Sequence, residues 1–97
     1  MNRTIIVDLL TERRDRLKAR FGAKHLALFG SAARDELRDD SDIDVLVELD
    51  GPSTFQGYFD LKAELERLFD RQVDLVTERG LKPRARQHVE KDLIRVA

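Results

Sequence analysis

Two aspartates stand at the start of one of the most apolar segments of this chain. Asp42 and Asp44 flank Ile43 and precede Val45 and Val47. Alternate side chains of a β-strand share a face, so a strand here places both carboxylates together and buries the aliphatic residues on the other face. Neighbouring carboxylates repel each other, and burial penalises their charge further. A divalent cation removes both penalties, and Mg²⁺ prefers carboxylates together with substrate phosphates.

A third carboxylate, Asp74, lies within the short apolar segment Val73–Val76. If this segment is a strand beside the first one, Asp74 lies ~5 Å from the Asp42 and Asp44 pair. Three carboxylates around one point can hold two metal ions, an arrangement that favours in-line displacement at phosphorus. Asp42, Asp44 and Asp74 are therefore the candidate catalytic residues and metal ligands.

A glycine and a serine supply the features of a phosphate site upstream of these acids. Gly30 and Ser31 follow the apolar run His25–Phe29 and begin a short predicted helix. Glycine allows the backbone to approach a phosphate closely, and a helix N-terminus offers free amides to an anion. The Ser31 hydroxyl can donate to a phosphate oxygen. Together with the aspartates, this turn describes a site for a nucleoside triphosphate and Mg²⁺.

Each of these residues taken alone also has an ordinary structural interpretation. Ser31 is a common helix N-cap. Asp42 suits a turn, and Asp44 and Asp74 suit an edge strand, where charge discourages aggregation. The structural interpretation must hold at every one of these positions at once, and the glycine must also stand at the right place by chance. The combination favours a functional site.

The predicted elements give a small α/β or α+β domain with three strands and helices around them. Gly22 is the expected stop of the first helix, and Ser53 with Gln56 has the spacing of a capping box before the third. The last helix is expected to begin at Pro83 and to line one face with Ala85, Val89, Leu93 and Val96. In chain order we predict a helix over Thr4–Phe21, a strand over His25–Phe29, a short helix to Leu37, a strand over Asp42–Leu49, a helix to Phe69, a strand over Val73–Val76 and the last helix.

Composition limits the classes of protein to which the chain can belong. Its 97 residues fit one domain, and the near balance of 18 basic and 19 acidic side chains gives no argument for binding nucleic acid or a membrane. The chain has no cysteine, which excludes disulfides and thiolate metal sites. No apolar stretch approaches the ~20 residues of a membrane span. We expect a cytoplasmic protein.

The motif Gly30-Ser31, ten intervening residues, then Asp42-Ile43-Asp44 resembles the signature of the DNA polymerase beta-like nucleotidyltransferases. Nearly the whole chain looks like the minimal members, the MntA-type antitoxins paired with HEPN-domain toxins. The matching segments are LFGSAAR, DSDIDVLVEL, VDLVT and LKPRARQHVEKDLI. The resemblance implies one minimal nucleotidyltransferase domain over residues 1–97, with a mixed sheet of three to four strands flanked by helices.

The resemblance also implies a role for each candidate residue. Asp42 and Asp44 would bind two Mg²⁺ ions, and Asp74 would complete one metal site and help to lower the pKa of the attacking hydroxyl. Gly30, Ser31 and Arg34 would bind the nucleotide. The reaction would transfer AMP from ATP to a tyrosine of the cognate HEPN ribonuclease toxin and thereby silence it.

Two residues depart from the family pattern, and two other functions stay open. Many relatives carry Arg in place of Ala32 and Gly in place of Asp35, which bears on affinity for the triphosphate more than on the metal ligands. We expect Asp35 to stabilise the short helix if it stays near the positive end of that helix. The alternatives are an antitoxin that neutralises its partner by binding alone, and a nucleotidyltransferase that modifies a small-molecule hydroxyl.

Two further features have open interpretations. Arg79, Lys82, Arg84 and Arg86 are either a solvated basic face or a surface for the nucleotide phosphates or for an acidic partner. Tyr58, the only tyrosine, is a possible site of self-adenylylation, but its spacing with Leu61 and Leu65 favours the core.

Overall fold

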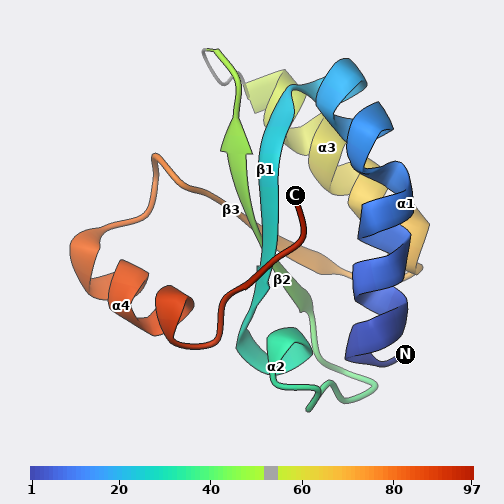
Figure 1. The fold of residues 1–97 in the computed structure, drawn as a ribbon, viewed down its shortest axis with the longest axis vertical. Coiled ribbons are helices and arrows are strands. Elements are labelled where there is room, and N and C mark those ends of the chain that lie inside the picture. The colour runs from blue at the N-terminus through green and yellow to red at the C-terminus, as the bar shows by residue number, and fades with distance from the viewer. Residues whose placement is uncertain (52–54) are drawn as a thin grey trace.

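In the computed structural model, which describes residues 1–51 and 55–97, helices pack against both faces of a four-stranded sheet (Figure 1). The strand order is β3-β2-β1-β4. The elements are α1 (Arg3–Phe21), β1 (Ala23–Phe29), α2 (Gly30–Ala33), β2 (Ile43–Leu49), α3 (Phe55–Phe69), β3 (Val73–Thr77), α4 (Pro83–Lys91) and β4 (Ile94–Arg95). The predicted mixed α/β fold is confirmed. The sheet has four strands, which is within the three to four that the resemblance implies and one more than the sequence pattern predicts. No helix in the described ranges is long and apolar enough to cross a membrane.

The main core lies between one face of the sheet and the pair α1 and α3, which cover that face together (Figure 1). Ile43, Val45 and Val47 of β2 are fully buried there, as the alternation of the sequence predicts. The helices contribute the apolar residues that recur at helical spacing, namely Ile6, Leu10 and Leu17 from α1 and Leu61, Leu65 and Phe69 from α3. This packing fixes which face of β2 carries the aspartates.

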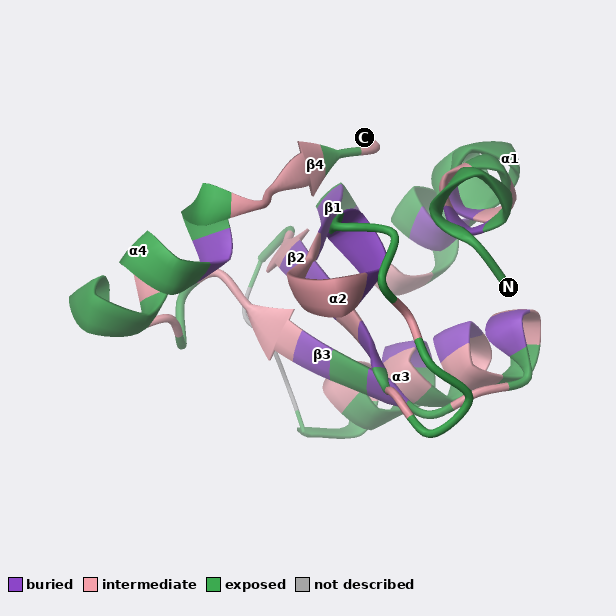
Figure 2. Ribbon diagram, turned by 90° about the horizontal axis from the view of Figure 1, so that it is seen from below, coloured by how far each residue is buried: buried purple, intermediate pink, exposed green. Residues whose placement is uncertain are grey.

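Among the described helices, α4 is the one that packs on the other face of the sheet (Figure 2). Ala27, Leu46 and Val89 form a small second core cluster there. Val89 is the only buried residue of α4, and most of the rest of this helix is exposed. The face that bears Asp44 is therefore closed in the middle of the sheet and open at its end.

Strand register brings the predicted site residues to that open end. β2 and β3 run parallel, and Asp44 pairs with Asp74. β1 and β2 run antiparallel, and Phe29 pairs with Asp44. Gly30, the first residue of α2, directly follows Phe29, so the predicted phosphate turn and the acidic pair come from three adjacent strands. The helix α2 lies at this end, below β1 in Figure 1.

The ends of α1 and of α2 have clear local causes. Gly22 stops α1 as predicted, with φ 70° and its N–H donating to the carbonyls of Leu17 and Lys18. The prediction that α2 reaches Leu37 is wrong, because the chain reverses after Ala33. Asp35 takes the left-handed conformation with φ 60°. Its N–H donates to the carbonyl of Ala32 and the N–H of Glu36 donates to the carbonyl of Ser31, which is a Schellman cap.

The end of the chain also differs from the prediction. The last helix stops at Lys91, so Leu93 and Val96 are not on it. The edge of β1 would otherwise leave backbone donors and acceptors unpaired, and Ile94 and Arg95 pair with it as β4. Strand pairing thus overrides the helical period in this segment. The capping box predicted at Ser53 lies outside the described residues.

Candidate active site

The centre of the candidate site is the pair of carboxylates on β2 and β3. Asp44 and Asp74 occupy directly paired positions of parallel strands. The pKa of Asp44 is raised to about 6, first because burial penalises its charge and then because of the neighbouring Asp74, with a smaller contribution from Asp42. This unrelieved repulsion is the feature that a cation removes, and oxygen donors of this kind suit Mg²⁺.

Asp42 lies at the same end of the sheet, but it acts on Asp44 less strongly than Asp74 does. It directly precedes β2 and its side chain is exposed. Within residues 1–51 and 55–97, no three side chains of His, Cys, Asp or Glu are close enough together to hold a metal ion. The carboxyl pair itself fits a hard cation, and the position of the Asp42 carboxylate decides whether a third ligand joins it.

Gly30 packs directly against Asp44. A Cβ atom at Gly30 would stand 2.2 Å from Oδ2 of Asp44, and the glycine has φ +66°. A side chain here would be strained, since L-residues rarely adopt this conformation, and its Cβ atom would displace the Asp44 carboxylate. The backbone at the start of α2 therefore reaches the acidic pair, as the interpretation of a phosphate turn requires.

Ser31 lies in the first turn of α2 and is half-buried. The N-cap of this helix is Phe29, which makes no side-chain capping bond, so the alternative that Ser31 is an N-cap is wrong. Ser31 instead lines a surface depression together with Arg34, Arg38 and Ser41.

Arg34 is held by two carboxylates. Its guanidinium pairs with Asp92 at 2.9 Å and with Glu36 at 3.1 Å, and these partners raise its pKa. The positive charge of Arg34 slightly opposes the rise in the pKa of Asp44 that burial and Asp74 cause. Asp92 caps the C-terminal end of α4. Sequence reasoning missed Asp92 because the two partners are 58 positions apart.

The two departures from the family pattern have structural roles. Ala32 is fully buried in the main core, so a long side chain there would have to leave the core. Asp35 follows the C-terminal end of α2, so the condition under which it would stabilise this helix, a place near the positive end, is not met. Its carboxylate instead accepts a hydrogen bond of 2.9 Å from the N–H of Arg3, at the N-terminus of α1. Asparagine, aspartate and glycine are the residues that tolerate this backbone conformation.

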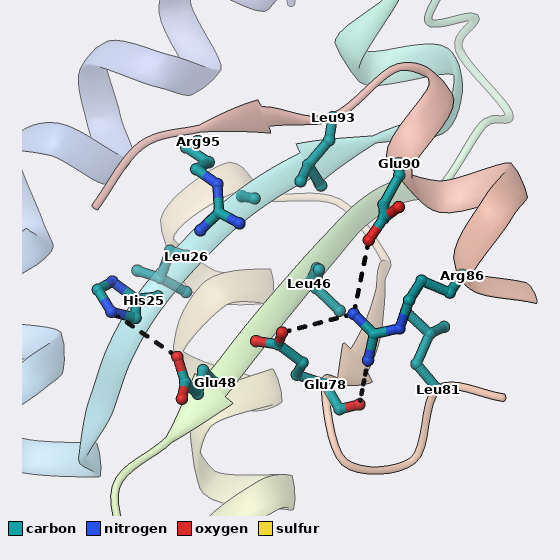
Figure 3. A pocket seen from close by; sticks show the side chains of 11 residues that line it. His25, Leu26, Leu46, Glu48, Glu78, Leu81, Arg86, Glu90, Leu93 and Arg95 are labelled. Carbon is teal, nitrogen blue, oxygen red and sulfur yellow. Dashed lines mark hydrogen bonds and ion pairs between the residues drawn. The ribbon is translucent and has the colours of Figure 1, made fainter. Parts of the chain in front are cut away.

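The basic cluster predicted near Pro83 lies at the other end of the sheet. Arg79 and Lys82 follow the end of β3 that is remote from Asp74, and both are exposed, as is Arg84. Arg86 is engaged within the protein, because its guanidinium pairs with Glu78 at 3.5 Å and with Glu90 at 3.6 Å (Figure 3). This geometry does not support contact between the cluster and the nucleotide phosphates.

Comparison with known proteins agrees with this geometry. The profile of the Nucleotidyltransferase domain matches residues 10–96, which is most of the chain. The chain belongs to the nucleotidyltransferase family. It is an enzyme of the nucleotidyltransferase type, as the resemblance in the sequence predicted.

Two relatives show where in the nucleotidyltransferase family the chain falls. MJ1379 of Methanocaldococcus jannaschii, named as a candidate protein adenylyltransferase, is 37% identical over 94 residues and covers 94% of each chain. The protein adenylyltransferase MntA of Thermococcus cleftensis is 36% identical over 77 residues, covering 79% of this chain and 78% of the relative. The chain is thus similar to nucleotidyltransferases whose named acceptor is a protein.

Solved structures of nucleotidyltransferases share the fold. A candidate minimal nucleotidyltransferase is 40% identical with a TM-score of 0.81, covering 97% of this chain and 95% of that one. A toxin–antitoxin complex with AMP-PNP is 26% identical with a TM-score of 0.73, covering 100% and 73%. A tri-AMPylated HEPN toxin with MNT antitoxin from Shewanella oneidensis, at 22% identity and a TM-score of 0.68, covers 94% and 71% and shares the fold alone.

Proposed function

We propose that this nucleotidyltransferase transfers AMP from ATP to a tyrosine hydroxyl of a cognate HEPN ribonuclease toxin and thereby acts as its antitoxin. The observation that carries the proposal is the Asp44 and Asp74 pair, in register on parallel strands and packed against Gly30. The named relatives are protein adenylyltransferases, and the neighbouring structures include complexes with a toxin. We further propose that residues 1–97 form one domain that works in the cytoplasm.

Asp42, Asp44 and Asp74 are the proposed ligands of two Mg²⁺ ions. When bound, Mg²⁺ neutralises the carboxylates and the phosphate charge and acidifies the attacking hydroxyl. The chain's own contribution is to hold the acids at one end of the sheet, with Asp44 half-buried and Asp74 in register with it. In the reaction, the acceptor oxygen forms a bond to the α-phosphorus, the bond from that phosphorus to pyrophosphate breaks, pyrophosphate leaves, and the hydroxyl proton passes to solvent water.

Gly30, Ser31 and Arg34 are the proposed nucleotide-binding residues. The close approach of Gly30 to Asp44 lets the backbone of α2 lie beside the phosphates. Arg34 carries the charge for a phosphate contact, but Asp92 and Glu36 occupy its guanidinium here. An ATP phosphate that binds Arg34 would therefore have to displace one of these carboxylates or bind the guanidinium beside them.

The test is transfer of label from α-labelled ATP to the purified HEPN toxin in the presence of Mg²⁺. We expect the wild-type chain to label the toxin and the double variant Asp42→Asn, Asp44→Asn to lose both labelling and neutralisation. Asp8→Asn, an exposed acid of α1, is the matched control and should retain both. The proposal fails if the wild type transfers no label and the double variant still neutralises the toxin.

Neutralisation by binding alone gains no support from the two departures. Asp35 forms the left-handed cap after α2, and Ala32 is buried in the core. Both departures therefore have a structural explanation that does not require the loss of the three candidate aspartates. For transfer to a small-molecule hydroxyl, the named protein adenylyltransferases among the relatives favour a protein acceptor instead. Both alternatives rank below adenylylation of a toxin.

A further inference from the structure

One arginine outside the predicted site ties together the two segments that deliver its acids. Arg71 lies in the short link between α3 and β3. Its Nη2 atom donates to the carbonyl oxygen of Ser41 at 2.9 Å and also to the carbonyl oxygen of Arg38. These acceptors are 30 and 33 positions away in the sequence. A single guanidinium therefore joins the link before β3 to the link before β2.

The turn that Arg71 grips is itself closed by hydrogen bonds. The N–H of Ser41 donates to the carbonyl of Arg38 at 3.1 Å, and the N–H of Arg38 donates to the Ser41 hydroxyl at 3.1 Å. The two carbonyls that Arg71 binds thus belong to one compact turn. Holding this turn fixes the backbone immediately before Asp42.

Arg71 acts at the point where the two acid-bearing strands begin. Ser41 directly precedes Asp42, and Arg71 stands three positions before Asp74. Next to Arg71, the carbonyl of Gln72 accepts a hydrogen bond of 3.0 Å from the N–H of Ile43. The backbone bond aligns the strands, and the arginine aligns the turn in front of them.

Asp42 is the acid that depends on this alignment. Asp44 and Asp74 are fixed by strand pairing, whereas Asp42 is exposed and lies just before β2. The planar guanidinium presents several donors in a rigid arrangement, so it can hold two carbonyls at once. A shorter amide side chain at this position cannot reach both carbonyls in the same way.

We propose that Arg71 is a positioning residue that sets the place of Asp42 relative to Asp74 and thereby the affinity of the acidic site for divalent cations. The inference rests on the proposed function, in which these aspartates bind Mg²⁺. Arg71 itself does not touch the reacting atoms. It acts through the Arg38–Ser41 turn.

The test compares Arg71→Gln with Arg67→Gln, a matched change at an exposed arginine of α3 whose side-chain partner is Glu64. Binding of Mn²⁺ in the presence of a non-hydrolysable ATP analogue is measured by electron paramagnetic resonance. Loss of a residue that orients metal ligands typically weakens metal binding 10–100-fold, so we expect about tenfold weaker binding for Arg71→Gln. Arg67→Gln should bind as the wild type does.

A double-mutant cycle separates positioning from a general loss of structure. If Arg71 acts through Asp42, Arg71→Gln causes little further loss of Mn²⁺ affinity in the Asp42→Asn background. In the single variant Arg71→Gln, the KM for Mg²⁺ should rise more than the KM for ATP does. If Arg71→Gln does not fold, Arg71→Lys, which keeps the charge and several donors, replaces it and should give an intermediate loss.

The outcomes distinguish this inference from the proposed function. Wild-type affinity for Mn²⁺ in a folded Arg71 variant overturns the inference and leaves the function standing, and so does equal loss in Arg67→Gln. Full additivity with Asp42→Asn also overturns it. If the wild-type chain binds no Mn²⁺, or if Asp42→Asn binds it unchanged, the assignment of the metal site fails and the inference with it.

Discussion

Gly30 illustrates how a single missing side chain shapes the candidate site. Its backbone has φ +66° and lies against Asp44, whereas Gly51 has φ +79° with nothing within 4 Å of an added Cβ. Both glycines have a positive φ, but only at Gly30 would an added Cβ atom meet the Asp44 carboxylate. Alanine variants at the two positions therefore separate the effect of backbone strain on stability from the effect of displacing Asp44 on activity.

We predict that Gly30→Ala and Gly51→Ala lose similar stability, about 1 kcal/mol each, because alanine is strained at positive φ. Only Gly30→Ala should also lose adenylylation, since its methyl group displaces the Asp44 carboxylate. Urea denaturation and a labelling assay measure the two effects. Equal activity of the two variants at saturating ATP would contradict the role of this contact.

Asp44 gives a prediction on pH, because its pKa is about 6 in the folded protein against an ordinary value of 3.8. The folded state therefore holds this proton to higher pH than the unfolded state does. The resulting stabilisation is present below about pH 4 and is lost as the pH rises through 6. Above that range, the ionised carboxylate destabilises the metal-free protein.

Replacement of Asp44 by the isosteric Asn should therefore stabilise the metal-free protein at pH 7.5. Because solvent screens part of the repulsion, we expect a gain of about 1 kcal/mol, or a Tm higher by about 4–8 °C for a chain of this size. The gain should vanish at pH 4. Thermal unfolding at both pH values, with Asp8→Asn as control, tests this, and a gain that persists unchanged at pH 4 would refute it.

At the scale of elements, α2 is held from two sides. The Arg34 and Asp92 pair joins its end to the end of α4, and Arg3 of α1 donates to the carbonyl of Ala33 at 3.1 Å. The helix has only four residues, so these links and its Schellman cap define its position. The phosphate turn is thus positioned by residues from both faces of the sheet.

We predict that Asp92→Asn lowers the KM for ATP roughly two- to fivefold, because the Asp92 carboxylate of this weak surface ion pair no longer competes with the phosphates for Arg34. Steady-state kinetics with varied ATP measure the change. Glu64→Gln, which breaks the comparable pair with Arg67, should leave the KM unchanged. A higher KM in Asp92→Asn would instead mean that the pair orients Arg34 for the phosphates.

The main elements and the acidic pair could be predicted from the sequence because they depend on local patterns. Alternation in β2 and the run at β3 each mark a strand, and the pairing of Asp44 with Asp74 follows once the strands are adjacent. The end of α2 and β4 could not be predicted, since a left-handed aspartate and an unpaired strand edge decide them. Asp92 and Arg71 act through contacts between distant segments, which no spacing in the chain reveals.

At the scale of the whole molecule, ligand binding should raise the free energy of unfolding. If Mg²⁺ and ATP bind the folded state as proposed, a ligand concentration 100 times Kd should add about 2.7 kcal/mol to the free energy of unfolding. We predict a clear rise in Tm with Mg²⁺ and ATP together for the wild type, and none for Asp42→Asn, Asp44→Asn. Differential scanning fluorimetry measures this, and an equal rise in the double variant would place ATP elsewhere.

Tyr58, the single tyrosine of the chain, has its hydroxyl turned inward. The half-buried side chain donates a hydrogen bond of 2.6 Å to the carbonyl of Leu75. The hydroxyl is thus engaged by the backbone of β3, which weighs against self-adenylylation at this position. An enzyme proposed to adenylylate tyrosines therefore holds the single tyrosine of its own chain in an internal hydrogen bond. If the proposed toxin is the acceptor, tyrosine-linked AMP in a mixture of the two proteins should lie on the toxin, and the enzyme incubated alone with ATP should stay unlabelled.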